Sequence, residues 1–172
     1  MITIRPLTLE HGPELAAVMQ RNREFLAPWE PERDQDYFTE ESVTATIGQL
    51  LKMREAGQTV PFVIDDDGAV VGRTTLNNIV RGPFQSASVG YWVDGDQGGR
   101  GTATQACRLV VEFAFAELGL HRVEAGTLVH NVRSQRVLER NGFEQFGFAP
   151  RYLEIAGAWQ DHLLFQRINE DY

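Results

Sequence analysis

A glycine-rich run in the middle of the chain has residue types that could hold an anion. Residues 94–104 read Asp-Gly-Asp-Gln-Gly-Gly-Arg-Gly-Thr-Ala-Thr, between an apolar segment at 89–93 and a helix that we expect to begin near Thr102. The first backbone N–H groups of a helix lack partners, and the helix dipole favours negative charge there. Glycines let the backbone approach such an anion closely. This run therefore predicts a phosphate or pyrophosphate site built from Gly98, Gly99, Arg100, Gly101, Thr102, Ala103 and Thr104.

Two other kinds of phosphate loop fit this run poorly. A Walker loop needs a lysine before Ser or Thr, whereas Thr102 follows Gly101 directly. The dinucleotide fingerprint needs a third glycine where this chain has Thr104, and the acid at a suitable distance, Glu124, lies inside a strand-like run. Neither pattern is therefore predicted.

Composition and charge restrict the class of protein. The chain has 172 residues, of which 42% are hydrophobic and 23% charged, so we expect one globular domain over residues 1–172. A net charge of −8 without a basic run argues against nucleic-acid binding. No apolar run is long enough for a membrane span, and no secretion signal is visible, so we expect a cytoplasmic protein. The four histidines and the single cysteine, Cys107, show no metal-ligand spacing, and we expect Cys107 to be packed rather than reactive.

The elements that must position the glycine run follow from apolar periodicity. In the first half we expect strands at 2–5, 61–64, 69–76 and 85–93, a helix from Thr8 or Glu10, a helix at 39–54, a proline-enforced loop at 25–31 and a hairpin turn at 65–68. In the second half we expect helices at 102–118 and 131–140, and strands at 122–129, 143–148, 151–155 and 159–168. This order predicts an α/β (α+β) fold with a largely antiparallel sheet opened by a crossover.

The glycine run and the segments after it resemble the GNAT N-acetyltransferases. Residues 98–103 match the second half of that family's Gln/Arg-x-x-Gly-x-Gly/Ala loop, although Gly98 replaces the first Gln or Arg and Gln97 comes one position early. Residues 130–143 resemble the family's Asn-x-x-Ser-x-x-Val-x-Glu-Lys-x-Gly-Phe segment. Residues 26–31, 151–153 and 157–162 resemble parts of the ribosomal-protein alanine N-acetyltransferases, the RimJ/RimL group. The resemblance covers nearly the whole chain and implies a mixed, mostly antiparallel sheet with a splayed central strand pair.

The resemblance also implies acetyl-CoA as the cofactor and assigns residues around it. Backbone groups of Trp92 and Val93 would hold the pantetheine arm, and Asn131 would meet the same arm. The Ser134 hydroxyl would donate a proton to the departing thiolate. Asn131 also has a purely structural interpretation, because asparagine is a favoured residue immediately before a helix.

A base for the acceptor amine is harder to assign from the sequence. Glu154, on an expected strand beside the site, is the first candidate, and a solvated strand carboxylate is the alternative interpretation. Glu30, Asp161 and His162 are further candidates. The loop that contains Trp29 and Glu30 is where we expect the acceptor to bind.

The sequence thus predicts direct acetyl transfer to a primary amine. The resemblance favours the N-terminal α-amine of a ribosomal protein. A small amine such as an amino acid or an antibiotic is the alternative acceptor, and a CoA-binding sensor without catalysis is the alternative class. The resemblance is also compatible with a homodimer, on which the sequence itself does not decide.

Overall fold

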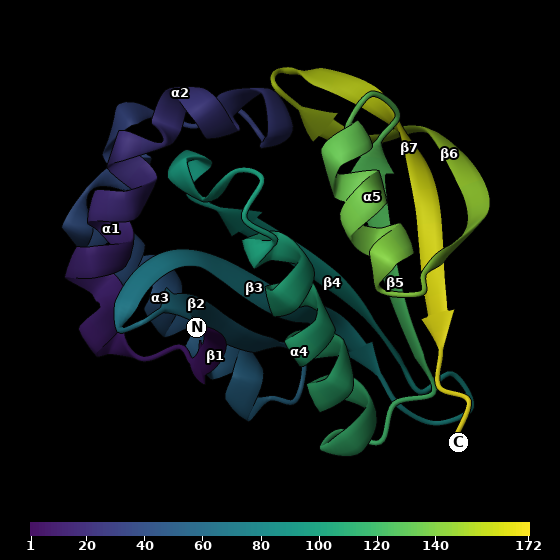
Figure 1. The fold of residues 1–172 in the computed structure, drawn as a ribbon. Helices are drawn as coiled ribbons and strands as arrows, with labels where there is room; N and C mark the ends of the chain where they lie inside the picture. The colour runs from purple at the N-terminus through teal and green to yellow at the C-terminus, as the bar shows by residue number, and fades with distance from the viewer.

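Seven strands form one mixed sheet, and helices cover both of its faces in the computed structural model, which describes residues 1–172 (Figure 1). The strand order is β1-β2-β3-β4-β5-β7-β6. The strands are β1 (Ile2–Pro6), β2 (Val60–Asp66), β3 (Ala69–Val80), β4 (Ser86–Val93), β5 (Arg122–Leu128), β6 (Glu144–Ile155) and β7 (Ala158–Ile168). The predicted fold class is confirmed.

The central strands β4 and β5 are the one parallel pair, and they stay together over only part of their length. Their register joins Ser86 to Arg122 and ends where Ser88 meets Glu124. Beyond that point β4 runs on to Val93 and β5 to Leu128, so the two strands diverge. This is the splayed pair that the family resemblance implies, and the other five strand pairs are antiparallel.

The helices divide between the two faces of the sheet. The helices α1 (Gly12–Arg21) and α3 (Glu40–Glu55) enclose one buried cluster with Val63 and Val70, whereas α4 (Thr102–Ala116) and α5 (Val132–Arg140) enclose a larger one. Of the two residues that the sequence offers as the cap of α3, Thr39 and Glu40, the structure selects Thr39, whose Oγ1 accepts a hydrogen bond from the Ser42 N–H at 3.2 Å. No helix is long and apolar enough to cross a membrane.

Cys107 belongs to the core on the α4 side of the sheet. Its side chain is 0% exposed, and burial raises the pKa of the thiol to about 12, against the opposing influence of Arg167. A thiol with so high a pKa holds its proton at neutral pH and is a poor nucleophile. The prediction of a packed rather than a reactive cysteine is confirmed.

The segment at 25–31 is more regular than predicted. It contains the end of the short helix α2 (Arg23–Leu26) and a 3₁₀ turn, η2 (Ala27–Trp29). Pro28 stands at the start of that turn, where its missing N–H has no partner to lose, so proline is compatible with the turn. The prolines therefore delimit helical turns here instead of enforcing an open loop.

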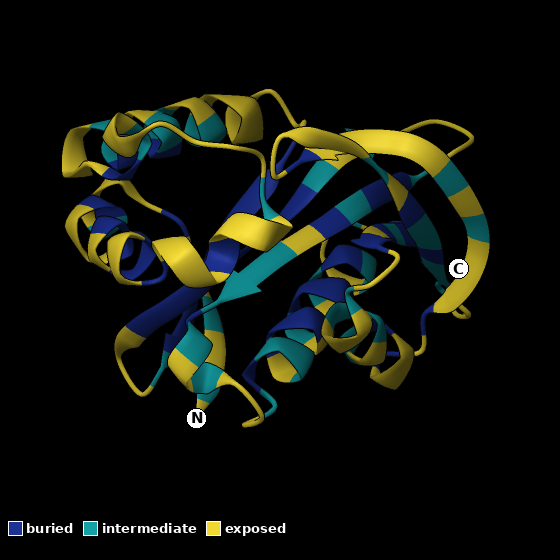
Figure 2. Ribbon diagram, turned by 90° about the horizontal axis from the view of Figure 1, so that it is seen from above, coloured by how far each residue is buried: buried dark blue, intermediate teal, exposed yellow.

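The outer strand β6 is one long strand, where the sequence predicted two. Its pairing with β7 shifts between Ala149 and Leu153, and Arg151 has a φ of +47° within the shift. Pro150 lies in this bulge, because a proline cannot donate a hydrogen bond to the ladder. Most of β6 is exposed beside the buried central strands (Figure 2).

Candidate acyl-transfer site

A cleft of about 620 Å³ lies where β4 and β5 diverge, between the starts of α4 and α5. Its lining includes most of the residues that the sequence predicted for the site. These are Trp29, Trp92, Val93, Gly98, Gly99, Gly101, Thr102, Ala103, Thr104, Asn131 and Ser134. Five predicted residues are not part of the lining, namely Arg100, Glu30, Glu154, Asp161 and His162.

The glycine run presents several free backbone donors at the start of α4. The N–H groups of Gly99, Gly101 and the first turn of α4, residues 102–104, donate to no protein atom. Two of the predicted donors are used internally: the Gly98 N–H donates to Gly95 O at 3.0 Å and the Arg100 N–H to Gln97 O at 3.3 Å. These two bonds close the tight turn that begins with η4 (Gly95–Gln97). Free backbone donors grouped at the N-terminus of a helix favour the binding of an anion.

The unusual position of the loop glutamine has a structural explanation. Gln97 Oε1 accepts a hydrogen bond from Thr102 Oγ1 at 2.8 Å, so this side chain braces the start of α4. Gly98 follows in an extended conformation with φ −57°. The glutamine thus lies at the cleft wall although it comes one residue early in the sequence.

Sequence reasoning missed three arginines that line the cleft from α5. Arg133, Arg136 and Arg140 follow one another at i, i+3 and i+7, a spacing that places them along one helix face. None of them forms an ion pair within the protein. The only carboxylate in the lining, Asp94, is paired with Arg21, so the cleft favours a ligand with several negative charges. The helical spacing could have grouped these arginines on one face, but not shown that this face lines the cleft.

Asn131 and Ser134 meet the cleft at the first turn of α5. Asn131 Oδ1 accepts a hydrogen bond from the Ser134 N–H at 3.2 Å, which confirms the predicted helix cap. Ser134 Oγ lies 2.9 Å from the hydroxyl of Tyr91, a contact that links α5 to β4. Burial raises the pKa of Tyr91, so its hydroxyl stays protonated over the whole working range of pH.

Successive residues of β4 face opposite sides of the sheet, as expected for a strand. Tyr91 packs against the core cluster of α4 and α5, and Trp92 packs against the cluster of α1 and α3. Both reach the cleft lining because β5 has moved away from β4 at this point. The opening therefore joins the two faces of the sheet.

Asp94 anchors the glycine run to α1. Its carboxylate accepts hydrogen bonds from the Asp96 N–H at 3.1 Å and from Arg21 Nε at 2.9 Å. Asn22 adds a second tie, because its Oδ1 accepts the Gly95 N–H at 2.9 Å. Burial by itself raises the pKa of Asp94, but the hydrogen bonds outweigh it and hold the pKa below its ordinary value.

Replacing Asp94 by asparagine is expected to remove an acid-sensitive part of the stability. The folded-state pKa is lowered, so the carboxylate stabilises the fold above its unfolded pKa of about 3.9, and this contribution is lost as the pH falls through the folded value. Thermal midpoints from pH 6 down to 3 should therefore fall less steeply for Asp94→Asn than for the unchanged protein. Glu112→Gln, which breaks an exposed pair with Arg108, is the control and should leave the slope unchanged.

On the face of the sheet that carries α1 and α3, two glycines leave the backbone uncovered beside the opening. Gly90 of β4 and Gly126 of β5 are exposed although they lie in central strands. A Cβ at Gly126 would lie 3.7–3.8 Å from Leu164, His162 and Tyr152. These three side chains bound a space next to the diverging strands that a side chain at position 126 would fill.

Glu30 lies near this face, whereas Glu154 does not reach the cleft. The Glu30 carbonyl accepts the Ala156 N–H at 2.9 Å, which ties the segment after α2 to the turn between β6 and β7. Burial raises the pKa of the Glu30 carboxyl, and the nearby positive charges of Arg33 and Arg73 oppose that rise. Glu154 is exposed on β6 opposite Trp159.

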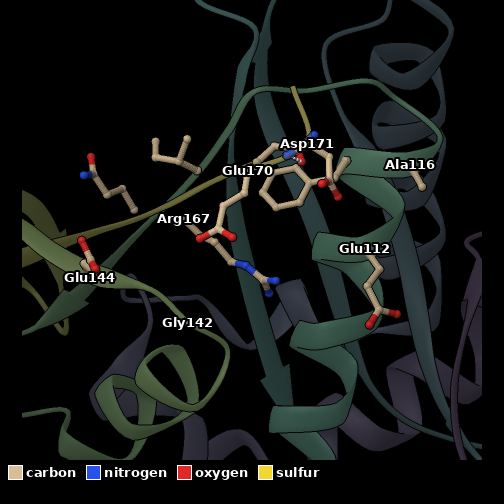
Figure 3. A pocket seen from close by; sticks show the side chains of 11 residues that line it. Glu112, Ala116, Gly142, Glu144, Arg167, Glu170 and Asp171 are labelled. Carbon is tan, nitrogen blue, oxygen red and sulfur yellow. Dashed lines mark hydrogen bonds between the residues drawn. The ribbon is translucent and has the colours of Figure 1, made fainter.

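A second cavity, of about 770 Å³, lies near the other end of α4 and has the opposite electrostatic character (Figure 3). Four carboxylates line it, from Glu112, Glu144, Glu170 and Asp171. Its one arginine, Arg167, donates to Asn141 O at 2.9 Å. The acidic lining disfavours a phosphate, so the cleft at the β4–β5 opening is the better seat for a nucleotide-like ligand.

Comparison with known proteins assigns the fold and site to a family. The family profile described as "Acetyltransferase (GNAT) domain" matches residues 1–144. The probable N-acetyltransferase YjcK of Bacillus subtilis is 37% identical over 172 residues, which cover 99% of this chain and 95% of that protein. The [ribosomal protein uS5]-alanine N-acetyltransferase of Escherichia coli is 32% identical over 160 residues, which cover 92% and 82% of the two chains.

Solved structures agree over the whole fold. RimJ of Mycobacterium smegmatis, determined in complex with CoA-disulfide, superposes with a TM-score of 0.96 at 34% identity, covering 99% of this chain and 83% of that one. The ribosomal-protein-S5-alanine acetyltransferase of Vibrio fischeri gives a TM-score of 0.93 at 34% identity, covering 99% and 94%. The splayed strands, the glycine run and these matches together establish that the chain belongs to the GNAT acetyltransferase family.

Proposed function

We propose that this chain transfers the acetyl group of acetyl-CoA directly to the N-terminal α-amine of a protein, with a ribosomal protein as the first candidate acceptor. The observation that carries the proposal is the cleft at the β4–β5 opening, which is lined both by free backbone donors and by the half-buried, paired hydroxyl groups of Tyr91 and Ser134. The matches to ribosomal-protein acetyltransferases from two bacteria support the choice of acceptor.

The phosphates of the donor fit the start of α4. The free N–H groups of Gly99, Gly101 and residues 102–104 would hold the pyrophosphate, and Arg133, Arg136 and Arg140 offer positive charge for it and any further phosphate. Gly98 and Arg100 shape the turn through their internal hydrogen bonds.

The arm of the donor would then follow β4 toward the opening. Strand ends that have lost their neighbour offer unpaired backbone groups, and Trp92 and Val93 lie on β4 past its last pair with β5. Asn131 lies on the other wall of the cleft. When bound, acetyl-CoA supplies an activated acetyl group as a thioester.

Ser134 is the proton donor to the departing sulfur in this proposal. Its hydroxyl lies in the cleft lining and within 2.9 Å of the Tyr91 hydroxyl, which can hold the Ser134 hydroxyl in position. The acceptor approaches from the opposite face, beside Gly90 and Gly126. An N-terminal α-amine has an ordinary pKa of about 7.7–8.0, so a useful fraction is already neutral near pH 7.

A side chain at position 126 is expected to weaken binding of the acceptor and to leave binding of acetyl-CoA unchanged. Gly126→Val adds a Cβ at 3.7–3.8 Å from Leu164, His162 and Tyr152, which is ordinary van der Waals contact, and its two methyl groups take up the space beside them. We expect the acceptor KM to rise about tenfold or more, which corresponds to about 1.4 kcal/mol. The dissociation constant of CoA, measured by isothermal titration, should stay unchanged.

Gly147→Val is the matched control for this substitution. Gly147 also contacts Leu164, at 3.5 Å from an added Cβ, but it lies on the outer strand β6 away from the opening. Its acceptor KM should remain that of the unchanged protein. Equal effects from the two variants would refute the placement of the acceptor beside Gly126.

The decisive experiment for the function is thiol release over a panel of acceptors, after titration with acetyl-CoA in the same sample. Release with peptides that begin in alanine or serine supports the proposal. Release with small amines only would replace the protein acceptor by a small one. Binding without release on any acceptor would favour a CoA sensor, and absence of binding would overturn the assignment of the cleft.

Two further parts of the proposal concern the cell and the assembly. A ribosomal acceptor and an acetyl-CoA donor both place the reaction in the cytoplasm. A homodimer stays a prediction, and light scattering of the purified chain would measure it directly.

A further inference from the structure

His162 occupies a central position on the sheet face beside the opening. It lies in β7, paired with Leu128 of β5 on one side and Ala149 of β6 on the other. Its neighbours Leu163 and Phe165 pack into the core of α4 and α5, so the alternation of the strand turns His162 to the opposite face. The Tyr152 ring lies 5.5 Å from its own, and the space above Gly126 adjoins it.

The hydrogen bonding of this histidine fixes which ring nitrogen is basic. Nδ1 lies 2.9 Å from the Gln160 carbonyl oxygen. A carbonyl only accepts, so Nδ1 carries the proton of the neutral ring and Nε2 carries a lone pair. Nε2 has no hydrogen-bond partner in the protein. It is also not a fully buried atom, because the one side-chain nitrogen or oxygen that is both fully buried and without a partner is Thr127 Oγ1. Nε2 is therefore not sealed from solvent, although His162 as a whole residue is only 3% exposed.

The carboxylates that the sequence offers as a base for the acceptor amine are less well placed than His162. Glu154 is exposed on the outer strand, opposite Trp159. Asp161 is exposed, and its Oδ1 accepts the Arg151 N–H at 2.8 Å. Glu30 is the remaining rival, because it is half-buried near the same face.

We propose that Nε2 of His162 is the general base of the acetyl transfer, an inference that rests on the proposed function. The acceptor nitrogen forms a bond to the thioester carbonyl carbon, and the carbon–sulfur bond breaks. The proton that leaves the nitrogen goes to Nε2, while the sulfur takes a proton from the Ser134 hydroxyl. Exchange with solvent returns both residues to their starting forms, so one amine and one thioester give one amide and one thiol.

Several charged groups surround this position and enter its pH dependence. Tyr152 of β6 contacts the ring, and Arg122 and Glu124 of β5 share its face, where they pair with each other at 2.6 Å. Glu30 approaches from the segment after α2, and Arg73 projects from β3 on the same side of the sheet. The pH profile must therefore be compared between variants and not interpreted alone.

His162→Asn is the sharpest test, because an asparagine amide can still donate to the Gln160 carbonyl but has no basic nitrogen. We expect single-turnover acetyl transfer to slow about 100-fold, with the CoA dissociation constant and the thermal midpoint unchanged. The ascending limb of the pH–rate profile should lose one ionisation and keep that of the acceptor amine. Free imidazole should restore several-fold activity to His162→Ala.

Other outcomes would overturn the assignment. A wild-type rate for His162→Asn removes His162 from the reaction. If Glu30→Gln loses the pH limb and His162→Asn keeps it, the base is Glu30. The measurement uses whichever amine the unchanged enzyme acetylates, or acetyl-CoA hydrolysis if none is found, so failure of the peptide acceptor bears on the proposed function and leaves the test of His162 intact.

Discussion

Replacing Ser134 by alanine lowers the single-turnover rate of acetyl transfer by about 100- to 1000-fold, the range expected when a positioned proton donor is lost. The leaving thiolate then has no hydroxyl beside it at the first turn of α5. CoA titration should give a dissociation constant within about twofold of the original, because the phosphates bind elsewhere in the cleft. Single-turnover kinetics are needed so that product release does not mask the chemical step.

Tyr91→Phe removes the hydroxyl group that contacts Ser134 Oγ. The ring still packs against the core of α4 and α5, but the 2.9 Å contact to Ser134 Oγ is lost. We expect the single-turnover rate to fall about tenfold, because Ser134 remains but is less well oriented.

An unchanged single-turnover rate in Ser134→Ala would remove Ser134 from the mechanism.

The second large effect is expected at the loop that holds the phosphates. Gly101 has a φ of +79°, a left-handed conformation that costs a β-branched residue of order 1–3 kcal/mol. Gly101→Val should therefore displace the N–H groups of Gly101 and the first turn of α4. Each lost bond to a charged group is worth about 1.5–3 kcal/mol, so we expect the CoA dissociation constant to rise at least about 100-fold.

Two further variants isolate the cause of that loss. Gly119→Val carries a similar strain, at φ +59°, just beyond the other end of α4, and should destabilise the fold without changing CoA binding. Gly101→Asn should bind nearly normally, since asparagine tolerates left-handed backbone. Retained binding in a folded Gly101→Val variant would show that the phosphates lie elsewhere.

The residues that were predictable from sequence are those whose role is decided locally. The helix caps Thr39 and Asn131 follow from side-chain chemistry within three residues. The Tyr91–Ser134 contact was not predictable, because its partners are 43 positions apart and meet only after α5 packs beside β4. The α5 arginines could be placed on one helix face, but which way that face points depends on the packing of Leu138.

Glu154 and His162 show the limits of reading strand faces from a sequence. The pairing of β6 shifts between Gln145 and Gly147, where two steps along β6 match one step along β7, so counting by two from Glu144 gives the wrong face beyond this point. His162 lies in a strand without a shift across its pairing with β5, and its face follows from its neighbours. Glu154 pairs with Trp159 and Ala149 pairs with His162, and positions 159 and 162 of β7 face opposite sides of the sheet, so Glu154 and His162 lie on different faces.

The backbone conformation of the glycine run limits which positions of the loop can change between related chains. Left-handed backbone is required at Gly99 and Gly101, whereas Gly98 has a φ of −57°, which every residue adopts. Binding of acetyl-CoA therefore depends more on a positive φ at positions 99 and 101 than on the side chains of the neighbouring residues. Related chains can therefore differ at position 100 without moving the free donors. A side chain at 98 would lie 3.1 Å from Gly95 O, and a replacement at 97 would lose the bond to Thr102.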